Sequence, residues 1–220
     1  MKTQAIVIGL GQFGMALARA LAEGGAEVIA VDKSEARVQA VATWVTSALC
    51  FDATDEMALA QTAPPRRDLC VCAIGDESRE GSIICTALFK QLGAERIVAR
   101  ATDPVHERIL RLVGAHEVVN PERAFGARYA TRLLYSKVID EVPLGPDLVI
   151  TELQAPDAIV GRSLIDLSLP RRFSITVVAL RTRDGKTIST PDPKAPIGQG
   201  DILVVVAPSN AVVKFLDRLG

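Results

Sequence analysis

"AIVIGLGQFGMALARALAEGGAEVIAVD" occupies residues 5–32, and this stretch decides the fold class. A short apolar run ends at Gly9, further glycines follow at Gly11 and Gly14, and leucines and alanines at helical spacing come next. This order predicts a strand, a glycine turn and a helix. The first glycine permits the turn, the second admits a pyrophosphate, and the third lets the helix pack closely on the sheet. We therefore expect an anion at this turn, facing the N–H groups of the helix N-terminus.

Asp32 ends the second predicted strand. A carboxylate at this place can accept hydrogen bonds from an adenosine ribose, and its charge disfavours the 2′-phosphate of NADP. The alternative is an acid that only caps the next helix beside Lys33 and Ser34. Because the acid accompanies the complete glycine pattern, we favour ribose binding. The pattern does not separate NAD from ATP, ADP or AMP.

The length and composition of the chain limit the classes of protein to which it can belong. The chain has 220 residues, a comfortable length for two domains. Hydrophobic residues make up 49% and aromatic residues 4%, so Val, Ile, Leu and Ala build the core, as in parallel strands covered by helices. A net charge of −1 gives no general attraction to nucleic acid or anionic lipid. The first apolar run is interrupted by glycines and no run is long enough to span a membrane, so we expect a soluble cytoplasmic protein.

The rest of the chain shows two different patterns of expected secondary structure. Strands alternate with helical segments as far as residue 119, which predicts a doubly wound parallel sheet. A further helix is expected over residues 120–137, and "EVPLGPD" at 141–147 indicates a break. The later strands, expected at 148–153, 175–180, 186–189 and 201–207, lack long helices between them, and a helix is expected at 210–219. The sequence thus predicts a nucleotide-binding domain at 1–140 and a small α+β domain at 141–220.

The four cysteines do not form a redox or zinc motif. Cys70 and Cys72 lie one residue apart in an apolar run, where strand geometry puts both on one face. Cys50 and Cys85 also have apolar neighbours, and we interpret all four as small buried residues of a protein in a reducing cytoplasm.

Catalytic patterns are not evident in the sequence. His106 and His116 are its two histidines, and we interpret both as ordinary surface or core residues. We find neither a GxSxG elbow nor a Walker-type lysine. The sequence therefore favours a binding module over an enzyme.

Seven short motifs together carry a family resemblance. In chain order they are VIGLGQFG (7–14), VIAVDKSEARV (28–38), FDATDE (51–56), CAIGDE (72–77), LGAERIVAR (92–100), LVGAHEVVNPERAFG (112–126) and GRSLIDLSLP (161–170). The ordered set resembles the RCK family, the regulator-of-potassium-conductance subunits of Ktr and Trk potassium transporters, over nearly the whole chain. The resemblance implies a Rossmann-like N-terminal lobe and a small α+β C-terminal lobe.

The resemblance also implies a set of nucleotide-binding residues. The glycines would hold phosphates, Asp32 the ribose, and the residues after the third and fourth strands the adenine side and the phosphates. The full set is Gly9, Gly11, Gln12, Phe13, Gly14, Asp32, Lys33, Asp52, Ala53, Thr54, Ile74, Gly75 and Arg100. The ligand expected is an adenine nucleotide: ATP or ADP first, then NAD(H) or AMP.

Two positions leave their role open. Gln12 stands where close Ktr relatives carry an arginine that reaches a neighbouring subunit's nucleotide phosphates, and a glutamine cannot neutralise a γ-phosphate. Glu122, in the family's "PE" motif, implies a ligand for magnesium, calcium or sodium at a dimer interface. The alternative for Glu122 is a first-turn acid on a helix dipole.

The resemblance further implies a cytosolic protein that forms dimers and an octameric ring beneath a membrane-embedded potassium-translocating subunit. Nucleotide exchange would change the ring and gate potassium flux. Phe125, Tyr129 and Leu133 would pack in the dimer, although a plain core role is the alternative. In some relatives the C-terminal lobe binds a cyclic dinucleotide.

Two other function classes are weighed against this one. A small NAD-dependent oxidoreductase needs an acid–base group beside the nicotinamide, which the sequence does not identify. An NADH-responsive regulator of another partner is the third. We expect no nucleic acid partner, since neither a helix-turn-helix pattern nor a basic stripe is evident.

Overall fold

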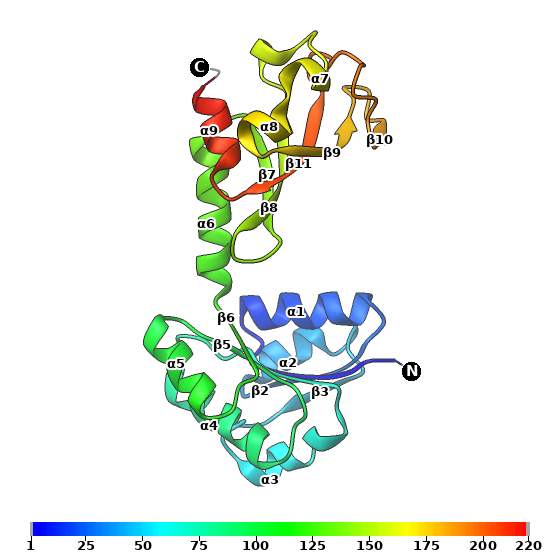
Figure 1. The fold of residues 1–220 in the computed structure, drawn as a ribbon. Coiled ribbons are helices and arrows are strands. Elements are labelled where there is room, and N and C mark those ends of the chain that lie inside the picture. Colours follow the sequence, from blue (N-terminus) through cyan, green and yellow to red (C-terminus); the bar gives the residue numbers. More distant parts are fainter. Residues whose placement is uncertain (1, 219–220) are drawn as a thin grey trace. The chain divides into compact units, whose positions relative to one another are not determined.

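The computed structural model describes residues 2–218, which form two compact units divided after Pro121 (Figure 1). The expected boundary lay later, near residue 140. The helix α6 (Pro121–Leu134) has no buried residue, and the strand β7 (Val138–Pro143) pairs with β8 (Leu148–Gln154). Most of the segment expected to close the first unit is therefore part of the second.

The first unit is built on a six-stranded sheet of order β3-β2-β1-β4-β5-β6. Every neighbouring pair is parallel, as the alternation of strands and helices predicts. Ile6 on β1 pairs with Ile29 on β2 and with Cys70 on β4, which makes β1 a central strand. The strands are β1 (Gln4–Ile8), β2 (Glu27–Asp32), β3 (Ser47–Cys50), β4 (Leu69–Cys72), β5 (Ile97–Arg100) and β6 (Glu117–Val119).

Helices cover both faces of this sheet (Figure 1). Val7 and Val71 pack with Ala18 of α1 and Val38 of α2 on one face. On the other face, the core draws on α3, α4 and α5, each of which has an N-cap side chain that accepts backbone N–H bonds. The helices are α1 (Gln12–Glu23), α2 (Glu35–Val41), α3 (Glu56–Ala60), α4 (Arg79–Gln91) and α5 (Pro104–Leu112), with a 3₁₀ turn at η1 (Pro64–Arg66).

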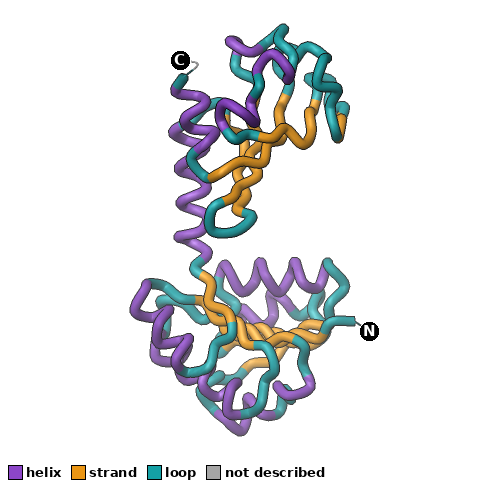
Figure 2. The backbone as a smooth tube through the Cα atoms, in the orientation of Figure 1, coloured by secondary structure: helices purple, strands orange, loops and turns teal. Residues whose placement is uncertain are grey.

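The second unit is an antiparallel sheet of order β10-β9-β11-β8-β7 with helices packed on it (Figure 2). Leu153 and Val205 are fully buried, and the ring of Phe215 meets Phe173 edge to face with centroids 5.1 Å apart. This confirms the small α+β lobe. Its further elements are η2 (Asp157–Ile159), α7 (Leu164–Leu167), α8 (Leu169–Phe173), β9 (Thr176–Arg181), β10 (Thr187–Ser189), β11 (Ile202–Pro208) and α9 (Ala211–Asp217).

The break expected at 141–147 is only partly a loop. Glu141, Val142 and Pro143 continue β7, and the turn begins after them. Proline lacks the N–H that a central strand needs, but β7 lies at the sheet edge, where one side of the ladder is open. The sequence expectation also missed α7 and α8, whereas the hairpin expected around Asp184-Gly185 is confirmed by the antiparallel pairing of β9 and β10.

Helix α6 presents an apolar row to solvent within its own unit. Phe125 and Tyr129 stack with ring centroids 5.6 Å apart, and Leu133 continues the row at the same spacing of four residues. The exposed fractions are 64% for Phe125 and 69% for Leu133. Across residues 2–218 no helix, α6 included, is both long enough and apolar enough to cross a membrane.

Three of the four cysteines are buried as expected, and one is not. Cys70 and Cys72 of β4 lie in one core with Cys85 of α4, whereas Cys50 is exposed. Cys50 ends β3, an edge strand whose side chains are at most half-buried. The apolar neighbours of Cys50 in the sequence therefore misled the prediction.

Thiol accessibility tests this arrangement. In the native protein we expect one fast reaction with Ellman's reagent, at Cys50, because the other three thiols are buried. Burial also raises the pKa of Cys70 to about 12, which suppresses its reactive thiolate. The fast phase should vanish in Cys50→Ser, persist in Cys85→Ser, and be joined by the remaining thiols after unfolding. A second fast thiol in native Cys50→Ser would contradict the structure.

Candidate functional site

The strand order of the first sheet reverses between β1 and β4, which makes this place the topological switch point of the sheet. From β1 the chain builds outward through β2 and β3, and it then returns to the other side of β1 with β4. In open parallel sheets the carboxyl ends of such a pair flank a crevice in which ligands bind. The residues that follow β1 and β4 therefore define the place to look for a site.

The glycine turn follows β1 with the geometry that the sequence predicts. Gly9 has φ +90°, and a Cβ there would lie 2.9 Å from the backbone nitrogen of Ile74. A Cβ on Gly14 would clash with the carbonyl oxygen of Gly9, so helix and strand approach as closely as two backbones can. A Cβ on Gly11, in contrast, would meet nothing within 4 Å. The turn is thus tight on its inner side and open at Gly11, where a phosphate group would approach the backbone.

The N-terminus of α1 fits an anionic group. Gly11 is the N-cap residue, no side chain caps the helix, and the first turn carries no acid. The first N–H groups of an α-helix have no partner within the helix and carry partial positive charge. Gln12, the first residue of the helix, is exposed, while Phe13 and Gly14 face inward to differing degrees. The residues present therefore fit a phosphate or pyrophosphate.

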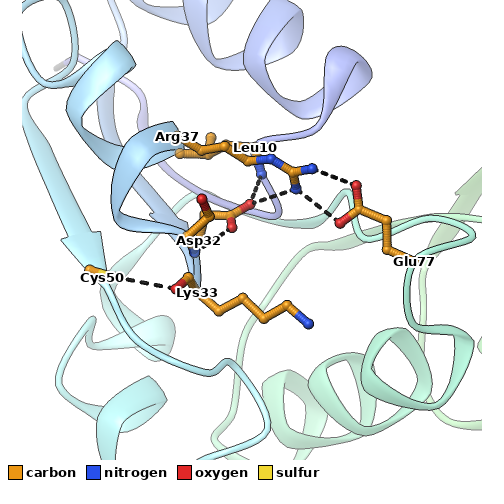
Figure 3. Close-up of polar contacts among 7 residues, drawn as sticks. Leu10, Asp32, Lys33, Arg37, Cys50 and Glu77 are labelled. Atoms are coloured by element: carbon orange, nitrogen blue, oxygen red, sulfur yellow. Dashed lines mark hydrogen bonds and ion pairs between the residues drawn. The ribbon is translucent and has the colours of Figure 1, made fainter.

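Asp32, predicted as the ribose acceptor, is turned toward the protein itself (Figure 3). Its Oδ2 accepts a hydrogen bond from the N–H of Leu10 at 2.6 Å, and its Oδ1 accepts one from the N–H of Ser34 at 2.8 Å. The side chain is only 4% exposed. The carboxylate thus ties the glycine turn to the end of β2 and also accepts the N–H of Ser34, the N-cap residue that directly precedes α2.

Arg37 and Glu77 lie beside Asp32, and the sequence analysis did not single them out as site residues. The Arg37 guanidinium donates to both Glu77 oxygens, with Nη1 to Oε2 at 2.9 Å and Nη2 to Oε1 at 2.6 Å. Nη1 also lies 3.6 Å from Oδ2 of Asp32. The bond from Arg37 lowers the pKa of Glu77, and the two carboxylates raise the pKa of Arg37. The two positions are far apart in the chain, so the sequence alone offers no indication of this contact.

Arg100 and Gly75 meet on the other side of the switch point. The guanidinium of Arg100 occupies the space that a Cβ of Gly75 would need, so a larger residue at position 75 would displace this side chain. The same guanidinium lies 6.0 Å from the ring centroid of Phe13 on α1. Arg100 ends β5 and therefore brings positive charge to the carboxyl edge of the sheet next to the glycine turn.

The residues after β3 form a short structured turn. Oδ1 of Asp52 accepts from the backbone N–H of Thr54 at 2.9 Å and from its hydroxyl at 2.8 Å. These bonds, the backbone bond first, lower the pKa of Asp52, and the charge of Lys33 acts in the same direction. Ala53 is buried in the core beneath. The predicted residues of the first unit thus lie at or after the carboxyl ends of β1 to β5, and Glu122 belongs to the first turn of α6, in the second unit.

No side-chain cluster of metal-ligating type accompanies Glu122. Within residues 2–218 there is no group of three or more His, Cys, Asp and Glu side chains that could hold a metal ion. Magnesium commonly binds through one or two carboxylates together with substrate phosphates, which a single glutamate can serve. The cation predicted at this position stays a prediction.

Comparison with known proteins follows the same division of the chain. Residues 5–121 match the model of the TrkA-N domain, and residues 148–220 match that of the TrkA-C domain. Ktr system potassium uptake protein C of Bacillus subtilis is 33% identical over 219 residues, which cover 100% of this chain and 98% of that protein. Ktr system potassium uptake protein A of Vibrio alginolyticus is 33% identical over 216 residues, covering 98% and 97%.

Solved structures share the fold. The crystal structure of the GsuK RCK domain matches with a TM-score of 0.67 and 17% identity, covering 100% of this chain and 48% of that chain. The GsuK channel bound to NAD also matches with a TM-score of 0.67, and this chain covers 40% of it. At such identity the likeness concerns the fold.

Two glycine substitutions separate packing from binding at the turn. Gly14→Ala places a methyl group against the Gly9 carbonyl, so the free energy of unfolding should fall by about 2 kcal/mol or more. Gly11→Ala meets no atom but puts a poorer residue at the N-cap of α1, so the free energy of unfolding should fall by only about 0.5–1 kcal/mol while binding of ADP weakens. Urea denaturation and calorimetric titration provide the two measurements. Equal stability losses in both variants would contradict the turn geometry.

Proposed function

The chain belongs to the family of proteins that join a TrkA-N domain to a TrkA-C domain, and from this premise we propose that it is a nucleotide-sensing regulatory subunit of a potassium uptake system. Two relatives that align over nearly their whole length are named as potassium uptake proteins of Ktr systems. In such a subunit the nucleotide acts by binding two conformations with different affinity. The membrane-embedded potassium-translocating subunit is the partner, and the protein works at the inner face of the membrane.

The open glycine cradle at the switch point carries the nucleotide part of this proposal. Gly11 leaves room for a phosphate beside an uncapped helix N-terminus, and Asp32, at the end of β2 and bonded to Leu10 of the same turn, would serve the ribose. An adenine nucleotide such as ADP, ATP or NAD would place its phosphates along residues 9–14 and its adenosine toward β2 and β3. Ile74, Gly75 and Arg100 would line the opposite side.

Binding without catalysis is the proposal for this site. The imidazole of His116 accepts the backbone N–H of Ile97 through Nδ1 at 2.9 Å, and the buried His106 directs Nδ1 toward Thr102. Burial lowers the pKa of His106. Both rings therefore serve structural contacts around β5 and α5, which supports a binding role over acid–base chemistry.

A divalent cation is part of the proposal through Glu122. Its carboxylate lies in the first turn of α6, and bound phosphates would supply the further oxygen ligands that magnesium or calcium prefers. Such a cation would neutralise phosphate charge at the site. The charge of the ligand is also where Gln12 matters, since a glutamine donates a neutral hydrogen bond that is about half as strong as a charge-assisted one.

Self-association is proposed through the apolar row of α6. Phe125, Tyr129 and Leu133 expose a continuous apolar strip, and Leu134 beside them is 76% exposed. Strips of this kind on soluble proteins mark association surfaces, and closed symmetric oligomers are the common result. We propose a dimer through α6 and a larger ring built from such dimers. A cyclic dinucleotide bound at the second unit stays a prediction.

Calorimetric titration of nucleotide-stripped protein tests the function. ATP, ADP, AMP, NAD and NADH are added separately, each with and without magnesium. We expect saturable binding of adenine nucleotides, with ATP and ADP within about fivefold of each other, because Gln12 gives the third phosphate no charge-assisted bond. Failure of all five to bind would overturn the proposal. Binding of NADH with hydride transfer to an added acceptor would favour an oxidoreductase instead.

A substitution on α6 tests the association surface. Tyr129→Asp puts a charge into the apolar row, so the dissociation constant of the dimer, measured by sedimentation, should rise at least about tenfold. Val178→Ser, at an exposed apolar position on β9, serves as the matched control and should leave association unchanged. Unchanged association in Tyr129→Asp, or a monomeric native protein, would contradict the role of α6.

A further inference from the structure

The carboxylate at the ribose position is covered in the structure. Both oxygens of Asp32 accept backbone N–H bonds, from Leu10 and Ser34, and the Arg37 guanidinium lies 3.6 Å from Oδ2. With 4% of its side chain exposed, Asp32 cannot meet ribose hydroxyls from solvent in this arrangement. Of the three groups around it, the two backbone N–H groups are fixed by the turn and by the start of α2. The Arg37 side chain is therefore the group that can move away.

Glu77 holds Arg37 in the covering position. Two hydrogen bonds, at 2.9 and 2.6 Å, join the guanidinium to both carboxylate oxygens in the bidentate geometry that is strongest for this pair. Arg37 is on α2, after β2, and Glu77 is in the loop after β4. Because β1 lies between β2 and β4 in the sheet, the pair reaches across the end of β1, where the glycine turn starts. Figure 3 shows Arg37 between Asp32 and Glu77 in this position.

We propose that the Arg37–Glu77 pair is a latch that closes the ribose side of the site in the ligand-free protein and that an adenine nucleotide opens. The inference rests on the proposed nucleotide-binding function and adds a device that regulates the same site. Opening separates Glu77 from Arg37, moves the guanidinium off Asp32, and exposes the carboxylate to the ribose hydroxyls. Opening would act on the phosphates only through the charges of the pair, which reaches across the start of the glycine turn.

The latch also connects the ligand to the helices behind it. Glu77 directly precedes Ser78, whose hydroxyl accepts the N–H of Gly81 and caps α4. The next residue, Arg79, pairs with Asp103 and donates to Thr102 at 3.2 Å, and Asp103 is the cap of α5. Release of Glu77 would therefore act on the residues at the starts of α4 and α5. Through them, ribose binding would change the conformation of the first unit.

The expected strength of the latch is modest. Arg37 is 35% and Glu77 56% exposed, and exposed ion pairs contribute little. The free energy needed to open the latch should therefore weaken ADP binding by the native protein about three- to fivefold. Lys33 and Arg100 also face Glu77 with positive charge, and Asp32 faces Arg37 with negative charge. Any substitution thus changes the local field as well as the latch, and the test has to separate the two effects.

Two substitutions with opposite changes of charge achieve this separation. Glu77→Gln removes the carboxylate that holds Arg37 and Arg37→Gln removes the covering side chain, but the first makes the site more positive and the second more negative. The full chain is titrated with ADP in a calorimeter, and with inorganic pyrophosphate, which has no ribose. Glu80→Gln and Arg66→Gln are the controls, because these exposed side chains carry the same charge changes outside the latch.

The latch predicts that both variants bind ADP about three- to fivefold more tightly than the native protein, while the controls do not. With pyrophosphate, charge alone acts, so Glu77→Gln should bind it equally or more tightly and Arg37→Gln more weakly. Tighter ADP binding by Glu77→Gln with weaker binding by Arg37→Gln is a charge effect and overturns the latch. Unchanged ADP affinity in both variants overturns it as well.

Failure of the latch and failure of the proposed function have different signatures. A native protein that binds ADP while Arg37→Gln gains no affinity overturns the latch and leaves the nucleotide-binding function standing. A native protein that binds no adenine nucleotide, with variants that bind none either, overturns both. A native protein without measurable affinity whose two variants bind ADP supports a latch stronger than its exposure indicates. Thermal unfolding of each variant confirms that the fold is retained.

Discussion

The close approach of Gly14 to the carbonyl of Gly9 is the constraint on which the rest of the site depends. Because neither residue has a side chain, α1 begins immediately against the end of β1 and directs its first N–H groups to the point where the strand order reverses. Backbone bonds fix this place in the sheet, from Gly9 to Val31 on β2 and from Ala73 after β4 to Ile8 on β1, both at 2.8 Å. A single turn therefore ties together three strand ends and a helix end. Every proposed ligand contact depends on the position of this turn.

The balance of charge around this turn suits an anionic ligand only because acids and bases are paired. Asp32 and Glu77 would both repel phosphate, but Arg37 lies between them and neutralises part of their field. Lys33 and Arg100 add positive charge nearby, as their effect on Glu77 shows. In the proposed latch, an arginine that leaves Asp32 would change this balance locally, so Asp32 would serve the ribose without a permanent cost to phosphate binding.

Sequence patterns predicted the parts of the molecule that depend on neighbouring residues. The strand, turn and helix of residues 5–32 follow from local periodicity and glycine geometry, and so do the positions of Asp32 and Gly75 at strand ends. The contact of Arg37 with Glu77 depends instead on the order of the strands, which brings α2 and the loop after β4 together. The membership of β7 in the second unit, and the exposure of Cys50 on an edge strand, likewise depend on which strands become neighbours.

In the proposed function, the two sides of the candidate site would report different parts of a ligand. Phosphates would meet the N-terminus of α1, whose first residue is Gln12, whereas the adenosine would meet Asp32 and the Arg37–Glu77 pair that leads to α4 and α5. A ligand shifts a conformational equilibrium only through contacts that differ between the states. Ligands that share adenosine would make the same contacts on the adenosine side and would therefore act on it equally. Discrimination between ADP and ATP therefore has to arise at α1 and at the cation proposed near the phosphates. Under the proposed latch, the presence of any adenine nucleotide would be sensed through β2 and the loop after β4.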